Sequence, residues 1–144
     1  MQIGTGMQNK ILEAMAIKIP CITSPLAAKE IGATHLKNIL KAKNEGRRVV
    51  AIGTTVLRCL ESVATMYSDL KPYEGETDLY IYPGYQFKIV DALLTNFHLP
   101  KSSLFLLVSA FGGSERIMSA YLHAIRNEYR FFSYGDSMFI TNNE

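Results

Sequence analysis

GYQFKIVDALLTNFHLPKSSLFLLVSAFGG, residues Gly84–Gly113, decides the fold of this chain. Residues 87–97 form an apolar run with β-branched members, which predicts a strand that is covered on both faces. Polar side chains follow, and Pro100 with two serines opens a predicted helix over residues 104–111, which a pair of glycines ends. A strand, a polar turn and a buried helix thus succeed one another, so chemistry is expected at the turn.

The turn carries an amide, an imidazole and an ammonium group, on Asn96, His98 and Lys101. A single histidine after a strand also has a structural explanation. His98 becomes a candidate for chemistry because the other two polar residues lie beside it.

Composition sets the outer limits. The chain has 144 residues, of which 48% are hydrophobic and 19% are charged, and this indicates one ordered domain. A net charge of +2 does not by itself indicate a nucleic acid partner. Cys21 and Cys59 are too few and too far apart for a disulfide framework or a zinc site. The apolar runs are too short for a bilayer and no signal peptide is evident, so we expect a cytoplasmic protein. Because no cluster of metal ligands has the needed spacing, we expect no metal.

A second buried strand is predicted at residues 49–52, and Gly53, Thr54 and Thr55 lead from it into a helix. The threonines either cap this helix or, with its amide groups and Arg58, receive an anionic or polyol group. Arg58 could also pair with Glu61. If this strand is parallel to the one at residues 89–97, both end at the same edge of the sheet.

Aromatic residues surround the turn at Pro83-Gly84, after an alternating segment at residues 78–82 that predicts a strand. Tyr82, Tyr85 and Phe87 are either core residues or a platform for stacking a base.

Further along the chain, Ser114 is expected to cap a helix with an apolar stripe of Ile117, Met118, Tyr121, Leu122 and Ile125. Residues 130–140, RFFSYGDSMFI, predict an aromatic strand interrupted at a glycine. Asp136 there either forms a turn or brings a carboxylate to the site. The basic residues between 37 and 48 form either a solvated face or a contact with RNA phosphates.

The N-terminal segment has a signal of its own. GTGMQNKILEAMA, followed by IPCITSPLA with a predicted strand at residues 19–23, resembles the nucleotide-sugar half of retaining glycosyltransferases with two Rossmann-like domains (GT-B). The resemblance implies that Glu13 matches a glutamate that holds the nucleotide ribose. It covers residues 1–40 and departs from the family at Lys18, where glycine is usual. The acceptor half is absent, so the chain is not expected to be a working glycosyltransferase.

Three blocks in the remainder, GRRVVAIGTTVLRCLES, the segment from GETDLY to VSAF, and YRFFSYGDSMFI, closely resemble the C-terminal part of the S-adenosylmethionine:tRNA ribosyltransferase-isomerase family of queuosine biosynthesis. The resemblance covers residues 42–143. It departs at Val56, where serine is common, and at Cys59, where a small hydroxyl residue is common. The family's N-terminal part, well over half of the enzyme, is missing from this sequence.

The resemblance implies an α/β fold, either a partial barrel or an open, mostly parallel sheet with flanking helices. It implies that the family transfers and isomerises the ribosyl portion of S-adenosylmethionine onto 7-aminomethyl-7-deazaguanine in a queuosine-type tRNA anticodon. The product is epoxyqueuosine, and adenine and methionine are released. S-adenosylmethionine would be the ribosyl donor substrate, and no metal is implied.

For individual residues, the resemblance implies three roles. Asn96, His98 and Lys101 would be the polar and proton-handling groups. Thr54, Thr55 and Arg58 would anchor the donor or a tRNA phosphate. The remaining substrate-binding candidates would line a base pocket or reach the site: Tyr82, Tyr85, Phe87 and Asp136.

Two segments are therefore predicted, a glycosyltransferase-like fragment at residues 1–40 and a ribosyltransferase-isomerase-like domain at residues 41–144. Three functions stay open: a family enzyme that needs its missing part, a noncatalytic hybrid or truncated fragment, and a small RNA-binding module. The sequence leaves the oligomeric state open.

Overall fold

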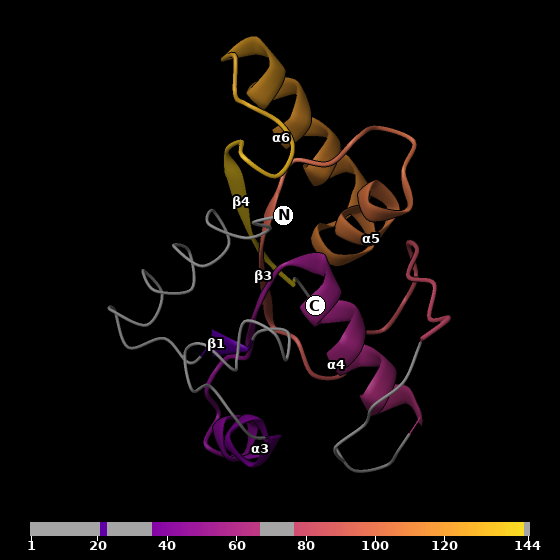
Figure 1. Cartoon of the computed structure of the whole chain (residues 1–144), viewed down its shortest axis with the longest axis vertical. Coiled ribbons are helices and arrows are strands. Elements are labelled where there is room, and N and C mark those ends of the chain that lie inside the picture. Colours follow the sequence, from indigo (N-terminus) through magenta and orange to yellow (C-terminus); the bar gives the residue numbers. More distant parts are fainter. Residues whose placement is uncertain (1–20, 23–35, 67–76, 143–144) are drawn as a thin grey trace, which may run out of the picture.

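The computed structural model describes residues 21–22, 36–66 and 77–142, and the predicted Glu13 site lies outside them. In chain order, the elements are β1 (Cys21–Ile22), α3 (Leu36–Asn44), β2 (Val50–Ile52), α4 (Thr54–Met66), β3 (Ala92–Asn96), α5 (Ser103–Gly112), α6 (Ser114–Arg126) and β4 (Ser137–Thr141). Figure 1 shows this α/β arrangement, in which a small sheet runs through the molecule and α4, α5 and α6 lie on one side of it.

The sheet has the order β1-β2-β3-β4 and is open. β2 is parallel to β1 and to β3, with Val50 opposite Ala92, whereas β4 is antiparallel to β3. The predicted parallel pairing of the two central strands is therefore confirmed, as is a mostly parallel sheet. Of the two predicted forms, the structure has the open one.

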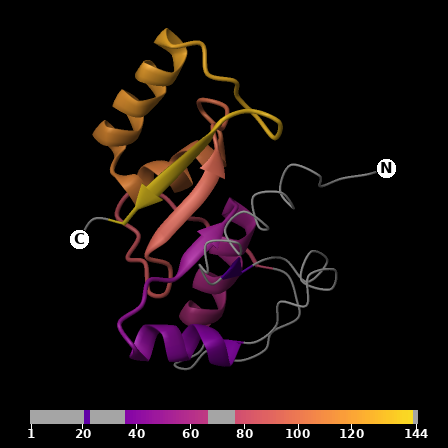
Figure 2. The ribbon, with the colours of Figure 1, turned by 90° about the vertical axis from the view of Figure 1, so that its left-hand side faces the viewer.

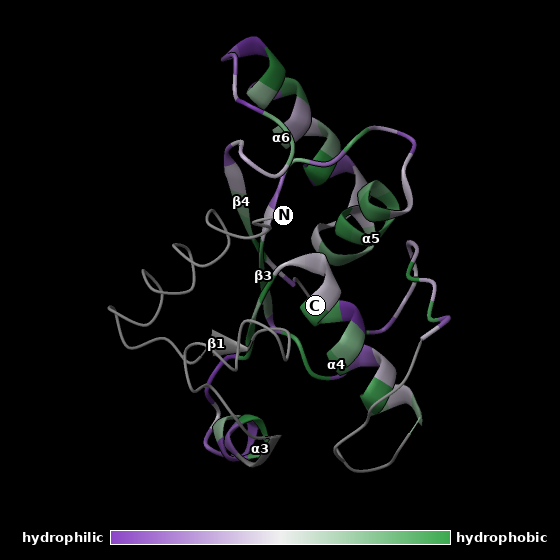
Figure 3. Ribbon diagram, viewed as in Figure 1, coloured by the Kyte–Doolittle hydropathy of each residue, from purple (hydrophilic) through white to green (hydrophobic). Residues whose placement is uncertain are grey.

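The helices on this side of the sheet build the core. α5 is apolar over nearly its whole length (Figure 3), and α4 buries Leu57, Leu60 and Val63. These side chains meet Leu93 of β3 and Ile140 of β4 in one continuous hydrophobic cluster. Burial of this cluster is the main force that holds the two central strands against the helices.

The decisive stretch folds as strand, turn and helix, but its strand is shorter than predicted. Only residues 92–96 join the sheet, because the N–H groups of Lys88, Ile89 and Val90 donate to the carboxylate of Glu61 and not to a strand. The predicted glycine stop after α5 is confirmed, since Gly113 has φ 84°.

Two other strand predictions need correction. Residues 78–82 alternate between exposed and inward side chains as predicted, but they form no strand. Residues 130–136 form a loop, and β4 begins only at Ser137.

The prediction for α6 was also partly wrong. Gly113 occupies the N-cap position and Ser114 is the first helical residue. Ile117 and Tyr121 are buried as predicted, together with Ala124, because α6 turns only one narrow side toward the core. The rest of the predicted stripe is exposed, and it comprises Met118, Leu122 and Ile125.

Candidate functional site

One edge of the sheet gathers the ends of three strands. β2 and β3 both end there because they are parallel, and β4 begins there, with Ser137 opposite Asn96. Gly53, with φ 95°, makes the turn from β2 into α4, and its N–H donates to the carbonyl of Leu94 at 2.8 Å. The carboxyl ends of β2 and β3 therefore share an edge, as predicted from their parallel pairing, and the start of β4 adds a third part of the sequence there.

The first group at this edge is the opening turn of α4. Thr54 is buried and Thr55 is exposed, and the first N–H groups of a helix carry partial positive charge. Arg58 lies one turn further on, and its Nη2 donates to the carbonyl of Thr77 at 3.3 Å. Arg58 and Glu61, which could have paired, thus have different partners. The turn offers hydroxyl and amide donors to an anionic or polyol group.

The second group is Asn96 with the loop that precedes β4. Asn96 is buried, and its Nδ2 donates to the carbonyls of Gly135 at 3.0 Å and Asp136 at 3.1 Å. The carboxylate of Asp136 accepts from the N–H of Arg130 at 2.8 Å, and the backbone N–H of Asp136 donates to the carbonyl of Arg130 at 2.7 Å. For Asp136, this geometry favours the turn-forming alternative.

The third group is His98, which lies two residues beyond β3. Its Nε2 is 3.0 Å from the hydroxyl oxygen of Thr95, and its backbone N–H donates to the hydroxyl of Tyr121 at 2.8 Å. Burial lowers the pKa of His98 and raises the pKa of Tyr121. For His98, this direction favours the neutral imidazole, the state in which one ring nitrogen can accept a proton.

Lys101 lies in the turn between His98 and α5. It is exposed and has φ 62°, a left-handed conformation. The next residue, Ser102, caps α5, accepting from the N–H of Phe105 at 3.1 Å and donating to the carbonyl of Leu99 at 2.7 Å. The cap fixes the turn, and Lys101 adds a solvent-facing positive charge to it.

The predicted aromatic platform does not form as one unit. Tyr85 and Phe87 pack edge to face with centroids 4.9 Å apart, and Phe87 packs on Phe111 of α5 at 4.7 Å. The hydroxyl of Tyr85 lies 3.3 Å from the Glu61 carboxylate, and burial raises the pKa of Tyr85. Because Glu61 is seven residues beyond Thr54, Tyr85 meets α4 about 10 Å along the helix from its opening turn. Tyr82 is exposed instead, with its ring 6.3 Å from that of Tyr80.

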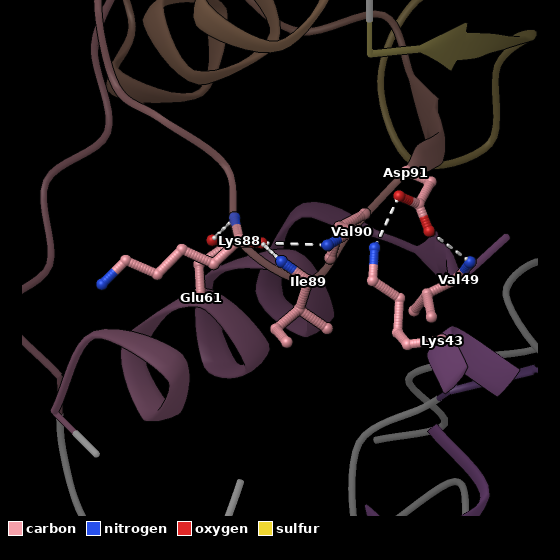
Figure 4. Close-up of polar contacts among 7 residues, drawn as sticks. All are labelled: Lys43, Val49, Glu61, Lys88, Ile89, Val90 and Asp91. Atoms are coloured by element: carbon pink, nitrogen blue, oxygen red, sulfur yellow. Dashed lines mark hydrogen bonds and ion pairs between the residues drawn. The ribbon is translucent and has the colours of Figure 1, made fainter. Parts of the chain in front are cut away.

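Glu61 holds the site together in a way that the sequence did not reveal. It is fully buried, and its carboxylate accepts from the N–H groups of Lys88 at 2.9 Å, Ile89 at 3.0 Å and Val90 at 3.0 Å (Figure 4). Its position on the same helical face as Leu57, four residues earlier, was the available signal. This carboxylate fixes the segment that enters β3.

Asp91, which follows Val90, forms a second fixed point. Its Oδ2 accepts from the N–H of Val49 at 2.7 Å, and its Oδ1 accepts from Lys43 Nζ at 2.8 Å (Figure 4). Asp91 thereby links α3 and the start of β2 to the start of β3. Two carboxylates together set the register that brings the ends of β2 and β3 to the same edge.

In residues 21–22, 36–66 and 77–142, no group of three or more histidine, cysteine, aspartate or glutamate side chains could hold a metal ion. Over those same residues, every helix is too short or too polar to cross a membrane.

The chain matches the family described as "Queuosine biosynthesis protein" over residues 27–140, which is most of its length. The chain belongs to this queuosine biosynthesis family. The resemblance drawn from the three sequence blocks is therefore confirmed. The family match begins at residue 27, earlier than residue 42, and the glycosyltransferase resemblance of residues 1–40 stays a prediction.

Relatives in this family are named S-adenosylmethionine:tRNA ribosyltransferase-isomerase. The protein of Coxiella burnetii (strain CbuG_Q212) is 63% identical over 112 residues, which are 78% of this chain and 32% of that protein. The protein of Natranaerobius thermophilus is 61% identical over 106 residues, which are 74% and 31% of the two chains. The chain thus spans about a third of the length of these curated relatives.

A solved structure shares the fold. The crystal structure of S-adenosylmethionine tRNA ribosyltransferase from Thermotoga maritima has a TM-score of 0.70 to this chain and 48% sequence identity. The similarity covers 73% of this chain and 37% of that chain. The open α/β arrangement is therefore the family's arrangement in this region.

Proposed function

We propose that this chain supplies part of a tRNA-modifying transferase of queuosine biosynthesis. The enzyme would transfer and isomerise the ribosyl portion of S-adenosylmethionine onto 7-aminomethyl-7-deazaguanine in a queuosine-type tRNA, giving epoxyqueuosine in the cytoplasm. The observation that carries the proposal is the meeting of the α4 opening turn, Asn96 and His98 at one sheet edge, in a family whose relatives are named for this reaction.

The reaction requires a group that takes a proton from the carbon next to the sulfonium sulfur. His98 suits this role because burial favours its neutral imidazole and Thr95 fixes its orientation through Nε2. The amine of the RNA base would then attack the ribosyl group, and adenine and methionine would leave. Both substrates must therefore be held together.

Donor binding falls to the opening turn of α4 in this proposal. Thr54 and Thr55 offer hydroxyl groups beside the first amides of the helix, which suit ribose oxygens or a tRNA phosphate. Arg58 would support the same contact from one turn further along. Lys101, three residues after His98, is exposed and would meet the RNA backbone.

The remaining candidates take more indirect parts. Asn96 and Asp136 would hold the loop before β4 in place, and Tyr85 and Phe87 would shape the core between α4 and α5. Tyr82 remains available for a base contact because it is exposed.

The test measures ribosyl transfer with this chain, alone and mixed with the remaining part of a relative supplied as a separate polypeptide. S-adenosylmethionine and tRNA carrying 7-aminomethyl-7-deazaguanine are the substrates, and epoxyqueuosine is detected by mass spectrometry after digestion. His98→Ala should lower turnover by about 100-fold or more while tRNA affinity stays the same. His123→Ala, which changes an exposed histidine of α6, is the matched control.

Equal turnover for His98→Ala and the parent would remove His98 from the chemistry. If tRNA binds but no product forms, either with the chain alone or with the mixture, the result would support an RNA-binding module in place of an enzyme. Absence of both binding and product from a folded chain would support a noncatalytic fragment.

A further inference from the structure

Residues 130–135, in the loop between α6 and β4, expose two aromatic side chains that the proposed reaction does not use. Phe132 is 55% exposed and Tyr134 is 77% exposed. Their neighbour Phe131 points the other way, with its ring 5.1 Å from Phe97 and 5.8 Å from Tyr121. The loop therefore uses one aromatic ring as an anchor and turns two outward, where apolar groups often mark a binding surface.

The loop is closed and well braced. The N–H of Asp136 donates to the carbonyl of Arg130 at 2.7 Å, and the Arg130 N–H donates to the Asp136 carboxylate at 2.8 Å. The N–H of Gly135 donates to the carbonyl of Phe132 at 2.9 Å. A side chain at Gly135 would lie 2.1 Å from the carbonyl oxygen of Arg130, so the closure requires glycine. The two exposed rings are thus mounted on a rigid turn.

Phe132 is also strained. Its φ of 69° lies in the left-handed region, which is unfavourable for a residue other than glycine. Its N–H donates to the carbonyl of Phe97 at 3.1 Å, which helps to hold this conformation. Glycine would adopt the same backbone without strain, so a large ring here is not explained by folding alone.

The loop lies at the candidate site. Phe97, its hydrogen-bond partner, directly precedes His98, and Asn96 holds the carbonyls of Gly135 and Asp136. Figure 2 shows the loop beside the carboxyl end of β3. The side chain of Arg130 is 78% exposed, and its Nη2 is 4.0 Å from Asp136 Oδ1, so its charge is only loosely paired.

We propose that this aromatic loop, residues 130–135, is a stacking platform for an unpaired nucleobase of the tRNA, with Arg130 contacting an adjoining phosphate. Exposed rings beside a cation are the arrangement that binds single-stranded nucleic acid, because every base has a face that stacks. The inference rests on the proposed tRNA-directed function. It moves the stacking role from Tyr85 and Phe87, which are partly buried against the core, to Phe132 and Tyr134.

The chain contains no tryptophan, so one can be introduced as a reporter. Tyr134→Trp should show saturable fluorescence quenching when unmodified tRNA is added, because a stacked base quenches indole emission. Phe139→Trp is the control, since Phe139 is also 55% exposed but lies on β4 outside the loop. A fully paired RNA duplex of similar length is the control ligand, because it offers no free base.

Affinity measurements give an independent readout. Phe132→Ala and Tyr134→Ala should each weaken tRNA binding by about 5-fold or more, whereas Phe139→Ala should leave it unchanged. Circular dichroism checks that each variant is folded.

The outcomes separate the inference from the function on which it rests. Saturable tRNA binding with no quenching at position 134 and no loss in either alanine variant would overturn the stacking platform and leave the proposed function standing. Equal quenching by the duplex would also overturn it, because contact would then be with the RNA backbone. Absence of tRNA binding to the parent chain would count against the proposed function itself.

Discussion

Replacement of Glu61 by glutamine tests how the decisive stretch is held. Glutamine keeps the shape of the side chain, but its amide nitrogen cannot accept a hydrogen bond. If its oxygen serves Ile89 and Val90, the N–H of Lys88 faces the amide nitrogen, while the hydroxyl of Tyr85 can rotate to accept. The orphaned N–H costs about 1–3 kcal/mol, and loss of charge from the two retained bonds costs about 1 kcal/mol each.

The expected loss is thus about 3–5 kcal/mol, a large part of the roughly 5–15 kcal/mol that stabilises a domain. Urea unfolding followed by circular dichroism measures it directly, and the melting temperature should fall by about 6–20 °C. Glu115→Gln, which changes an exposed carboxylate in the first turn of α6, is the matched control and should change stability only slightly. A loss below about 0.5 kcal/mol for Glu61→Gln would refute the reasoning, since that is the size of an ordinary surface substitution.

Three further changes test other parts of the structure. Asp91→Asn should cost only about 0–1 kcal/mol in urea unfolding, because the ion pair with Lys43 is about one third exposed and the amide oxygen can still serve Val49. For His98, burial lowers the folded-state pKa below the ordinary 6.5, so the unfolded chain binds a proton first as the pH falls. Stability should therefore be lost as the pH drops from about 6.5 toward the lowered pKa, and His98→Gln should show a smaller loss in the same titration. Gly135→Ala should destabilise the chain by about 1–3 kcal/mol and weaken tRNA binding, because its added carbon would displace a backbone carbonyl.

The central fold was predictable because its signals are local. The apolar runs of β2 and β3 and the cap of α5 lie within a few residues of the elements that they specify. The length of β3 was not predictable, since the N–H groups of residues 88–90 bond to Glu61, which lies 27 to 29 residues earlier. A contact of that separation leaves no mark on the apolar pattern of the strand itself.

The edge position of the candidate site was predictable from the parallel pairing of two strands. The roles of individual aromatic residues were not, because an aromatic side chain near a turn has the same local pattern whether it faces the core or the solvent. Tyr85 is partly buried because its hydroxyl meets Glu61 and its ring packs on Phe87. Tyr134 is exposed on a loop that backbone hydrogen bonds close. Whether an aromatic side chain is buried or exposed therefore depends on its neighbours in the folded structure.

The four residues from Thr95 to His98 include candidates for the chemistry that also stabilise the fold. Asn96 holds the loop before β4, the Phe97 carbonyl accepts from that loop, and His98 is fixed both by Thr95 and by the hydroxyl of Tyr121. Each residue therefore braces the edge where it would act, and an alanine at Asn96 would remove a donor from two carbonyls as well as any contact with substrate. A fall in activity alone cannot assign such a residue to catalysis. The role of His98 can be tested separately, because its side chain has one hydrogen-bond partner among the described residues, Thr95. Thr95→Val removes that hydrogen bond and leaves the imidazole in place. If His98 handles the proton, Thr95→Val should alter the pH dependence of turnover, whereas loss of packing alone would lower turnover equally at every pH.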